Sequence, residues 1–219
     1  MNIQWKPYHP PNTPLYRANL PQNTMQYLWS RIRQAKIDEV PWGHRLAGNI
    51  SSSLGLKDEN DYFLNTVVSP LVKRIIRQDP QRYTPALSPD VLDIIMRDPP
   101  LSMIWWVNFQ NQLEFNPQHC HEGIVSYVIW MKIPTDPQEQ HNQSFKSDSA
   151  SDFQFSYTNI MGEINELPII MDKSMEGVMM VFPSKLRHQV YPFYNCDENR
   201  ISIAAVSYTH LTLPTICSV

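Results

Sequence analysis

The stretch FQNQLEFNPQHCHEGIVSYVIWMKIP, residues 109–134, decides how the rest of the chain is expected to fold. It ends in an apolar run, 124–133, rich in the β-branched and aromatic residues that favour strands. His119 and His121 precede this run. Because side chains two positions apart on an extended backbone point to the same face, the two imidazoles can begin a metal site. Two imidazoles make an incomplete shell, and His188 is the best candidate for a third ligand.

Similar short segments, separated by proline, glycine and asparagine turns, fill the chain after Pro100. We expect eight strands, at residues 103–109, 114–121, 124–133, 153–157, 167–171, 177–182, 188–193 and 200–206. Eight short strands that follow helices predict an α+β fold, namely a double-stranded β-helix (a cupin-like jelly roll) backed by N-terminal helices. The polar segment 135–151 between two of the strands is expected to form either a long loop near the mouth of the site or a partly disordered insert.

Residues 1–100 are expected to supply an extended segment and supporting helices. Asn23 is a good N-cap for an amphipathic helix that reaches about Lys36, and Asp58 can cap a longer helix in which Pro70 should produce a kink. A third, short helix is expected at 88–96. With 219 residues, the chain suits one structural domain whose β-rich core spans 101–206.

Charge and composition narrow the classes of partner. A formal net charge of −3 without a dense basic run argues against nucleic acid and against an anionic membrane surface, so we expect a small-molecule or peptidyl substrate. The first residues are polar and broken by proline, and no run of about 18 apolar residues occurs. Three cysteines without CxxC spacing fit a reducing compartment. We therefore expect a cytoplasmic protein. Its oligomeric state is open, and a homodimer is compatible with the sequence.

Arg200 and Ser202 form a second pattern, near the end of the last expected strand. Period-two alternation puts the guanidinium and the hydroxyl on one face. Arginine presents a planar fork that pairs bidentately with a carboxylate, and a neighbouring hydroxyl can donate one more hydrogen bond. The pair therefore predicts a clamp for the carboxylate of a diacid.

Three segments, FNPQHCHEGIVSYVIWMKIP, EGVMMVFPSKLRHQVYP and ENRISIA, together resemble the iron(II)- and 2-oxoglutarate-dependent oxygenase superfamily over residues 105–205. The resemblance is greatest to its prolyl-hydroxylase-like members and to its phage and bacterial members. It implies a dioxygenase that uses Fe(II), 2-oxoglutarate and dioxygen, and hydroxylation as the outcome. It also implies metal ligands at His119, His121 and His188, and a 2-oxoglutarate clamp at Arg200 and Ser202. A phage-encoded member would work in the host cytoplasm.

The sequence departs from the family pattern at the second ligand. Better-known members have His-x-Asp where this chain has His-x-His, so a neutral ligand replaces an anionic one. We favour a three-histidine shell. In one alternative His121 and His188 are the ligands, Gly123 takes the carboxylate position and the metal stays open there. In another, Glu122 is recruited, which requires the strand to have ended. Trp130 stands where relatives often carry a tyrosine that touches 2-oxoglutarate.

Two other functions suit a jelly roll with this pattern. One is a cupin-like metal enzyme that does not use 2-oxoglutarate, and the other is a non-enzymatic virion or scaffold protein. Cys120, between the two histidines, is expected to pack in the core. The last residues, 207–219, resemble translated sequencing-adapter sequence, so we expect them to be a non-native tail without functional residues.

Overall fold

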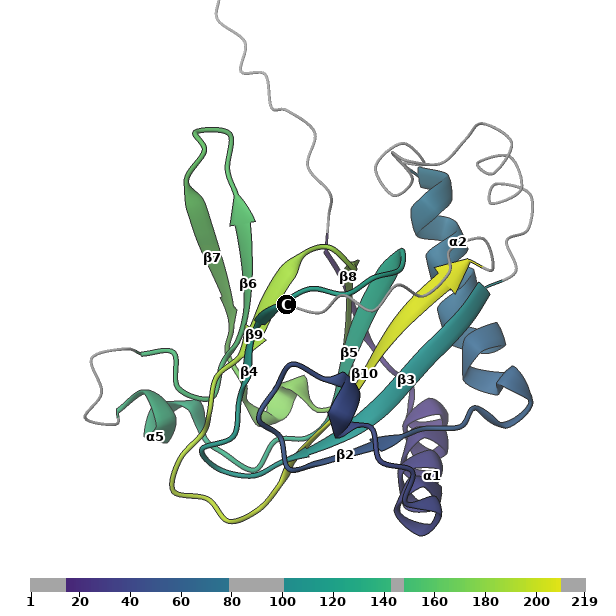
Figure 1. Ribbon diagram of the computed structural model, residues 1–219, viewed down its shortest axis with the longest axis horizontal. Helices are drawn as coiled ribbons and strands as arrows, with labels where there is room; N and C mark the ends of the chain where they lie inside the picture. The colour runs from purple at the N-terminus through teal and green to yellow at the C-terminus, as the bar shows by residue number, and fades with distance from the viewer. Residues whose placement is uncertain (1–14, 79–100, 143–147, 210–219) are drawn as a thin grey trace, which may run out of the picture.

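Two antiparallel sheets face each other in the computed structural model, which describes residues 15–78, 101–142 and 148–209 (Figure 1). The larger sheet has the strand order β1-β8-β5-β10-β3-β2, and the smaller has the order β4-β9-β6-β7. The strands are β1 (Tyr16–Asn19), β2 (Ser52–Gly55), β3 (Leu101–Gln110), β4 (Asn116–His119), β5 (Val125–Lys132), β6 (Phe153–Thr158), β7 (Ile164–Ile169), β8 (Val178–Pro183), β9 (Arg187–Val190) and β10 (Arg200–Thr209). This arrangement confirms the expected double-stranded β-helix.

Strand β10 lies in the middle of the larger sheet and pairs on both sides. Its partners are β3, over the whole length from Arg200 opposite Gln110 to Thr209 opposite Leu101, and β5. Odd-numbered residues of β10, such as Ile203, belong to the apolar core on the outer face, whereas even-numbered residues face the smaller sheet. The pairing of this strand therefore fixes which side chains lie between the sheets.

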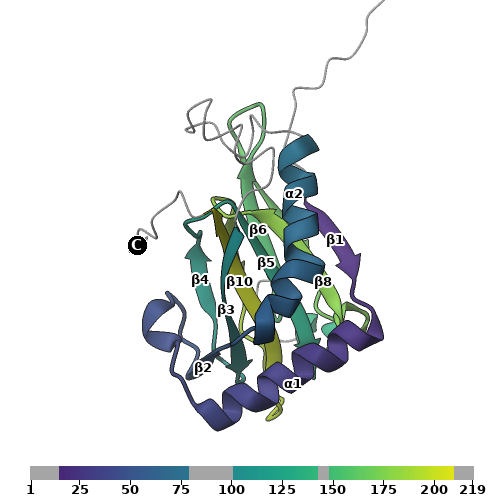
Figure 2. The same ribbon diagram turned by 90° about the vertical axis from the view of Figure 1, so that its right-hand side faces the viewer.

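Two helices, α1 (Gln22–Asp38) and α2 (Ser69–Gln78), cover the outer face of the larger sheet, away from the smaller one (Figure 2). Leu28 and Ile32 of α1 and Val72 of α2 are almost completely buried there, in one core with strand residues such as Val107 and Ile129. The helical backing expected from the sequence is thus confirmed. Within the described part of the chain, no helix combines the length and the apolar composition needed to cross a lipid bilayer.

The ends and kinks of the helices differ in detail from expectation. Helix α1 begins one residue before Asn23, and Pro21 occupies the cap position without a side-chain hydrogen bond. The longer helix expected after Asp58 is interrupted: a π-helical turn, Leu64–Val68, precedes α2. Pro70 is the second residue of α2, and its missing N–H explains why the hydrogen-bond pattern changes at this point. The helix expected at 88–96 lies outside the described residues.

Each of the eight expected strands has a counterpart, but residues 15–78, 101–142 and 148–209 together form ten strands. The two that were not expected, β1 (YRAN) and β2 (SSLG), are short and lack an alternating apolar pattern. The strand expected at 114–121 is shorter, since β4 covers only Asn116–His119 and its pairing with β9 is irregular. Strand β7 begins earlier than expected, at Ile164, and forms the outer edge of the smaller sheet, with Pro168 opposite Gln154.

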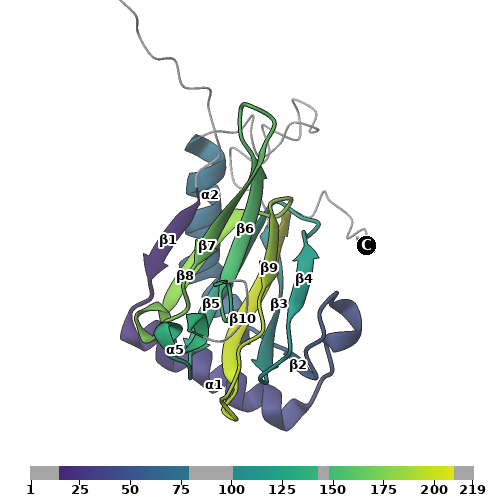
Figure 3. The same cartoon turned by 90° about the vertical axis from the view of Figure 1, so that its left-hand side faces the viewer.

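The segment 135–151 is partly helical and not simply a loop. Helix α5 (Pro137–His141) begins after Asp136, whose side chain accepts hydrogen bonds from the N–H groups of Gln138 and Glu139 (Figure 3). Gln140 fixes this helix, because its side-chain amide donates to the carbonyl of Tyr194 and accepts from its N–H, each at 2.8 Å. Residues 143–147 lie outside the described part of the chain.

The C-terminal boundary of the core is set by β10, which continues to Thr209 and pairs with β3 there. Residues 207–209 are therefore part of the sheet. That the residues from 207 onward are non-native stays a prediction, as do the other expected domain limits, and 210–219 lie outside the described residues.

Asp58 should be a main contributor to the stability of the helical layer. Its Oδ1 accepts hydrogen bonds from the Tyr27 hydroxyl at 2.5 Å and from the Phe63 N–H at 3.0 Å, and its Oδ2 accepts from the Leu64 N–H at 2.8 Å. Asp58→Asn leaves only one acceptor oxygen, so we expect the free energy of unfolding to fall by about 1–3 kcal/mol in urea denaturation. The matched change Asp61→Asn, at an exposed residue with a φ of 52°, should alter it by less than about 0.5 kcal/mol. Equal effects of the two substitutions would contradict this role of Asp58.

Candidate functional site

Three histidines, from strands β4 and β9 of the smaller sheet and from the turn after β4, come together between the sheets. His119 ends β4 and is the register partner of His188 on β9, while His121 follows two residues after the end of β4. The ring centroids are 4.3 Å apart for His119 and His188, and 5.0 Å apart for each pair that includes His121. One nitrogen from each ring lies within 4.8 Å of the others. This spacing suits three ligands around one metal ion.

Hydrogen bonds orient two of the imidazoles for coordination. The Nδ1 atom of His119 is 2.7 Å from the carbonyl oxygen of Pro117, and that of His188 is 2.9 Å from the carbonyl oxygen of Leu186. A carbonyl can only accept, so Nδ1 carries the proton in both rings and Nε2 keeps its lone pair. A backbone carbonyl behind a ligating histidine is the usual device that fixes this tautomer.

Burial keeps the three imidazoles neutral. Desolvation lowers the pKa of His119 below its ordinary value, and it lowers the pKa of His121, with a smaller contribution from His119, to about 3. Desolvation also lowers the pKa of His188 well below its ordinary value, because its ring stacks on Phe153 at 5.6 Å and meets the edge of Phe182 at 4.9 Å. At neutral pH all three rings are therefore uncharged, the form that binds metal.

The neighbours of His121 bear on the other two ligand sets that the sequence allowed. The strand has ended before Glu122, as recruitment of this residue requires, but the carboxylate accepts a hydrogen bond from Lys185 at 2.6 Å and is not part of the histidine group. Gly123 has a φ of 105° and begins the turn into β5. The geometry therefore brings together the three histidines and turns Glu122 toward a lysine.

The histidines line a cavity of about 650 Å³ whose other wall is the inner face of the larger sheet. Paired residues of β10 and β3 form successive rows across this wall, and each pair consists of two lining residues. The pairs are Arg200 with Gln110, Ser202 with Asn108, Ala204 with Trp106, and Val206 with Ile104. The first two rows are polar and the next two are apolar, so the wall changes character along the strands.

One of the three histidines, His121, lies beside the row at which the wall changes from polar to apolar. The ring of His121 meets that of Trp106, in the third row, with centroids 5.9 Å apart. Four residues of strand, about 13 Å, separate this row from Arg200. An arginine side chain and a five-carbon diacid together can span this distance, which suits a ligand held by a metal at one end and by Arg200 at the other.

Arg200 is a buried cation, with 2% of its surface exposed. Its Nη2 donates a hydrogen bond to the hydroxyl of Ser151, and its guanidinium carbon lies 5.1 Å from the centre of the Phe193 ring. Burial lowers the pKa of Arg200 to about 10, partly offset by the charge of Asp152, so the side chain is still positive at neutral pH. Among the described residues, Nε and Nη1 have no hydrogen-bond partner and no carboxylate forms an ion pair with Arg200.

The structure also places the other residues singled out in the sequence. Ser202 and Trp130 line the cavity, and Trp130 is buried with its ring edge-on to Phe153. Cys120 also lines the cavity and is only half-buried, so the expectation that it packs in the core is wrong. Sequence reasoning missed Ser151, since nothing in a polar segment marks one serine as the partner of an arginine 49 positions later.

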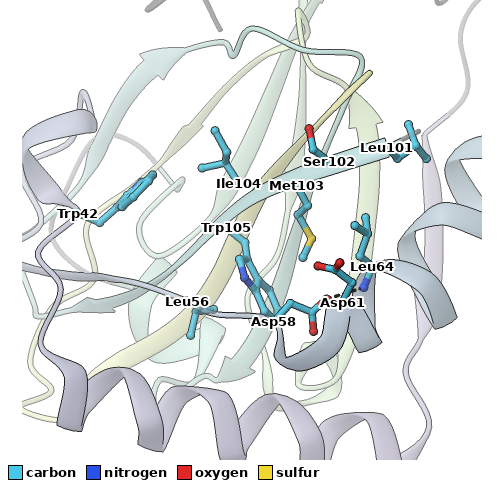
Figure 4. Close-up of a pocket in the computed structure, with 10 residues that line it drawn as sticks. All are labelled: Trp42, Leu56, Asp58, Asp61, Leu64, Leu101, Ser102, Met103, Ile104 and Trp105. Atoms are coloured by element: carbon cyan, nitrogen blue, oxygen red, sulfur yellow. Dashed lines mark hydrogen bonds between the residues drawn. The ribbon is translucent and has the colours of Figure 1, made fainter. Parts of the chain in front are cut away.

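A smaller cavity of about 400 Å³ lies along the first half of β3. Successive side chains of this strand point to opposite sides there, with Ser102 and Ile104 on one side and Met103 and Trp105 on the other (Figure 4). The cavity contains no histidine, and the Asp58 carboxylate beside it is already used in three hydrogen bonds. It therefore lacks the group of histidines that the larger cavity has.

Comparison with known proteins adds two findings. Residues 104–205 match the family described as "Putative 2OG-Fe(II) oxygenase". None of the curated proteins has significant sequence similarity to this chain.

Among solved structures, a prolyl-4-hydroxylase from Pseudomonas putida is similar, with 13% identity, a TM-score of 0.53, and coverage of 90% of this chain and 92% of that chain. A 2OG-Fe(II) oxygenase family oxidoreductase from Burkholderia pseudomallei aligns with 13% identity, a TM-score of 0.42, and coverage of 91% and 88%. At this identity the match to the hydroxylase shows a shared fold.

Gly123 should be needed for the turn that carries His121. A Cβ atom at this position would lie 2.5 Å from Cγ1 of Val206 and 2.8 Å from the carbonyl oxygen of Ser207. Gly162 also has a positive φ, of 82°, but no atom lies within 4 Å of its added Cβ. Both Gly→Ala changes place alanine at a positive φ, which destabilises the backbone. Because Gly123→Ala also causes overpacking, it should lower the free energy of unfolding by about 1–3 kcal/mol more than Gly162→Ala does. Urea denaturation of the two variants measures the difference, and equal losses would rule out the steric part.

Proposed function

Because residues 104–205 match the family described as "Putative 2OG-Fe(II) oxygenase", we propose that this chain is an iron(II)- and 2-oxoglutarate-dependent dioxygenase that hydroxylates a small-molecule or peptidyl substrate. The observation that carries the proposal is the presence, in one cavity, of three neutral histidines and a buried arginine, two of whose nitrogens have no partner in the described part of the chain. The first group suits a divalent metal, and the second suits the far carboxylate of a diacid.

His119, His121 and His188 would hold the iron. Imidazole suits Fe(II), although it also suits zinc, copper and nickel, so the histidines by themselves do not select the metal. Three neutral ligands leave the full charge of the dication uncompensated, which favours an anionic chelator such as a 2-oxo acid. When bound, the iron and 2-oxoglutarate supply the activation of dioxygen, and the chain supplies the positions and the dry pocket.

Arg200 and Ser202 would bind the far carboxylate of 2-oxoglutarate. A buried cation without an anionic partner is costly, and a carboxylate that pairs with Nε and Nη1 would offset this cost with two charge-assisted hydrogen bonds. Ser202, in the next row, can add a hydroxyl donor. Trp130, in place of the tyrosine of many relatives, offers an indole N–H on the neighbouring strand.

The substrate would then occupy the apolar rows of the cavity. Ile104, Trp106 and Val206 line this part, so the group next to the reacting C–H bond would be mainly apolar. In the proposed reaction, substrate, dioxygen and 2-oxoglutarate give hydroxylated substrate, succinate and carbon dioxide. One oxygen atom enters the new hydroxyl group and the other enters succinate.

Metal content tests the ligand set. His119→Ala, His121→Ala and His188→Ala should each weaken the binding of iron(II), measured on anaerobically purified protein, by at least about tenfold. His44→Ala should leave it unchanged, since His44 is an exposed histidine outside the group. Glu122→Gln should also retain metal binding. Loss of metal binding in that variant would indicate that Glu122, and not His121, is the third ligand.

Succinate formation tests the cosubstrate. Purified protein with iron(II), ascorbate and 2-oxoglutarate should release succinate, and Arg200→Gln should raise the KM for 2-oxoglutarate by about 30-fold or more, because it removes one side of a buried charge pair. Iron(II) binding by this variant should be unchanged. Wild-type protein that binds iron(II) but neither binds 2-oxoglutarate nor forms succinate would contradict the proposal in favour of a metal enzyme without this cosubstrate.

A further inference from the structure

The hydroxyl of Ser151 contacts both the buried arginine and a second hydroxyl group. It accepts the hydrogen bond from Nη2 of Arg200 and is 3.2 Å from the hydroxyl of Thr135. The two ends of the segment 135–151 therefore meet beside Arg200, and both Ser151 and Thr135 are buried, with 1% and 5% of their surfaces exposed. Through Ser151, one end of the segment contacts the residue proposed to bind the cosubstrate.

The backbone of Ser151 is held in an unusual conformation. Its φ is 75°, in the left-handed region that residues other than glycine rarely adopt, and its N–H donates to the carbonyl of Pro192 at 2.8 Å. A buried non-glycine residue in such a conformation persists only where its surroundings enforce it, and residues of this kind gather at ligand-binding sites. Here the conformation directs the hydroxyl to Arg200.

Ser151 occupies one of the three guanidinium nitrogens and leaves the other two free for a ligand. Phe193 packs against the guanidinium and Asp152 supplies a nearby negative charge. An arginine side chain loses considerable rotamer freedom when it binds a ligand, and fixing it beforehand lowers that cost. The contact at Nη2 would keep Nε and Nη1 directed at the cavity before a carboxylate arrives.

We propose that Ser151, supported by Thr135, is a positioning residue that presents Arg200 to the carboxylate of the cosubstrate farthest from the metal. The inference rests on the proposed function, because it takes 2-oxoglutarate as the ligand of Arg200. It adds a residue from outside the two sheets to the cosubstrate site. A merely structural role for Ser151 would affect folding and all ligands alike, whereas a positioning role affects only ligands that carry the second carboxylate.

The test compares two acids of equal chain length. 2-Oxoglutarate has the second carboxylate and 2-oxopentanoate does not, and their affinities for the iron(II)-loaded protein are measured by anaerobic calorimetry. Ser151→Ala should lower the affinity for 2-oxoglutarate about tenfold, in keeping with the loss of a hydrogen bond to a charged group. The affinity for 2-oxopentanoate should stay within about twofold of the wild-type value. Ser151→Gly removes the same hydroxyl but relieves the backbone strain, because glycine adopts a positive φ readily. It should show the same selective loss of affinity for 2-oxoglutarate relative to 2-oxopentanoate.

Ser207→Ala is the matched control. Ser207 is a buried serine on the same strand as Arg200, and its hydroxyl has no partner among the described residues. This variant should bind both acids like the wild type. Equal weakening of both acids in the Ser151 variants, or unchanged 2-oxoglutarate affinity, would overturn the inference alone. Absence of 2-oxoglutarate binding in the wild type would overturn the proposed function as well.

Discussion

The pairing of β10 with strands on both sides is the constraint on which the rest of the structure depends. In a strand, a shift of register by one residue turns every side chain to the other face. Such a shift would move Arg200 and Ser202 out of the cavity and expose the helical layer to polar groups, while Ile201 and Ile203 would lose their core contacts. The hydrophobic packing of α1 and α2 against the sheet therefore also fixes the chemistry between the sheets.

Much of this arrangement could be predicted from the sequence, because it follows from periodicity. The alternation around Arg200 and the spacing of His119 and His121 indicated which side chains share a face, and the β-rich half was recognisable from its apolar segments. The short polar strands β1 and β2 could not be predicted, since they exist through pairing with β8 and β3. The contact between Ser151 and Arg200 depends on how a polar segment docks, which no local pattern records.

The three-histidine group contains no carboxylate, whereas the His-x-Asp pattern of better-known oxygenases supplies one negative charge to the metal. In the structure, the nearest candidate by sequence, Glu122, is paired with Lys185. The proposed site would then carry positive charge at both ends. A metal dication held by neutral imidazoles would lie at one end, and the Arg200 guanidinium lies at the other. Both ends favour an anion, and a diacid that spans the polar rows of the wall would satisfy both with one molecule.

The outer edge of β7 has a consequence for the behaviour of the protein at high concentration. An edge strand offers unpaired N–H and C=O groups that can add a strand from another molecule. The neighbouring hairpin tip exposes Ile160, Met161 and Ile164, each to at least 75%, which would favour such an addition. Pro168, the second-last residue of β7, has no N–H and interrupts the edge there. One proline therefore protects this part of the sheet against aggregation that its apolar side chains would otherwise promote.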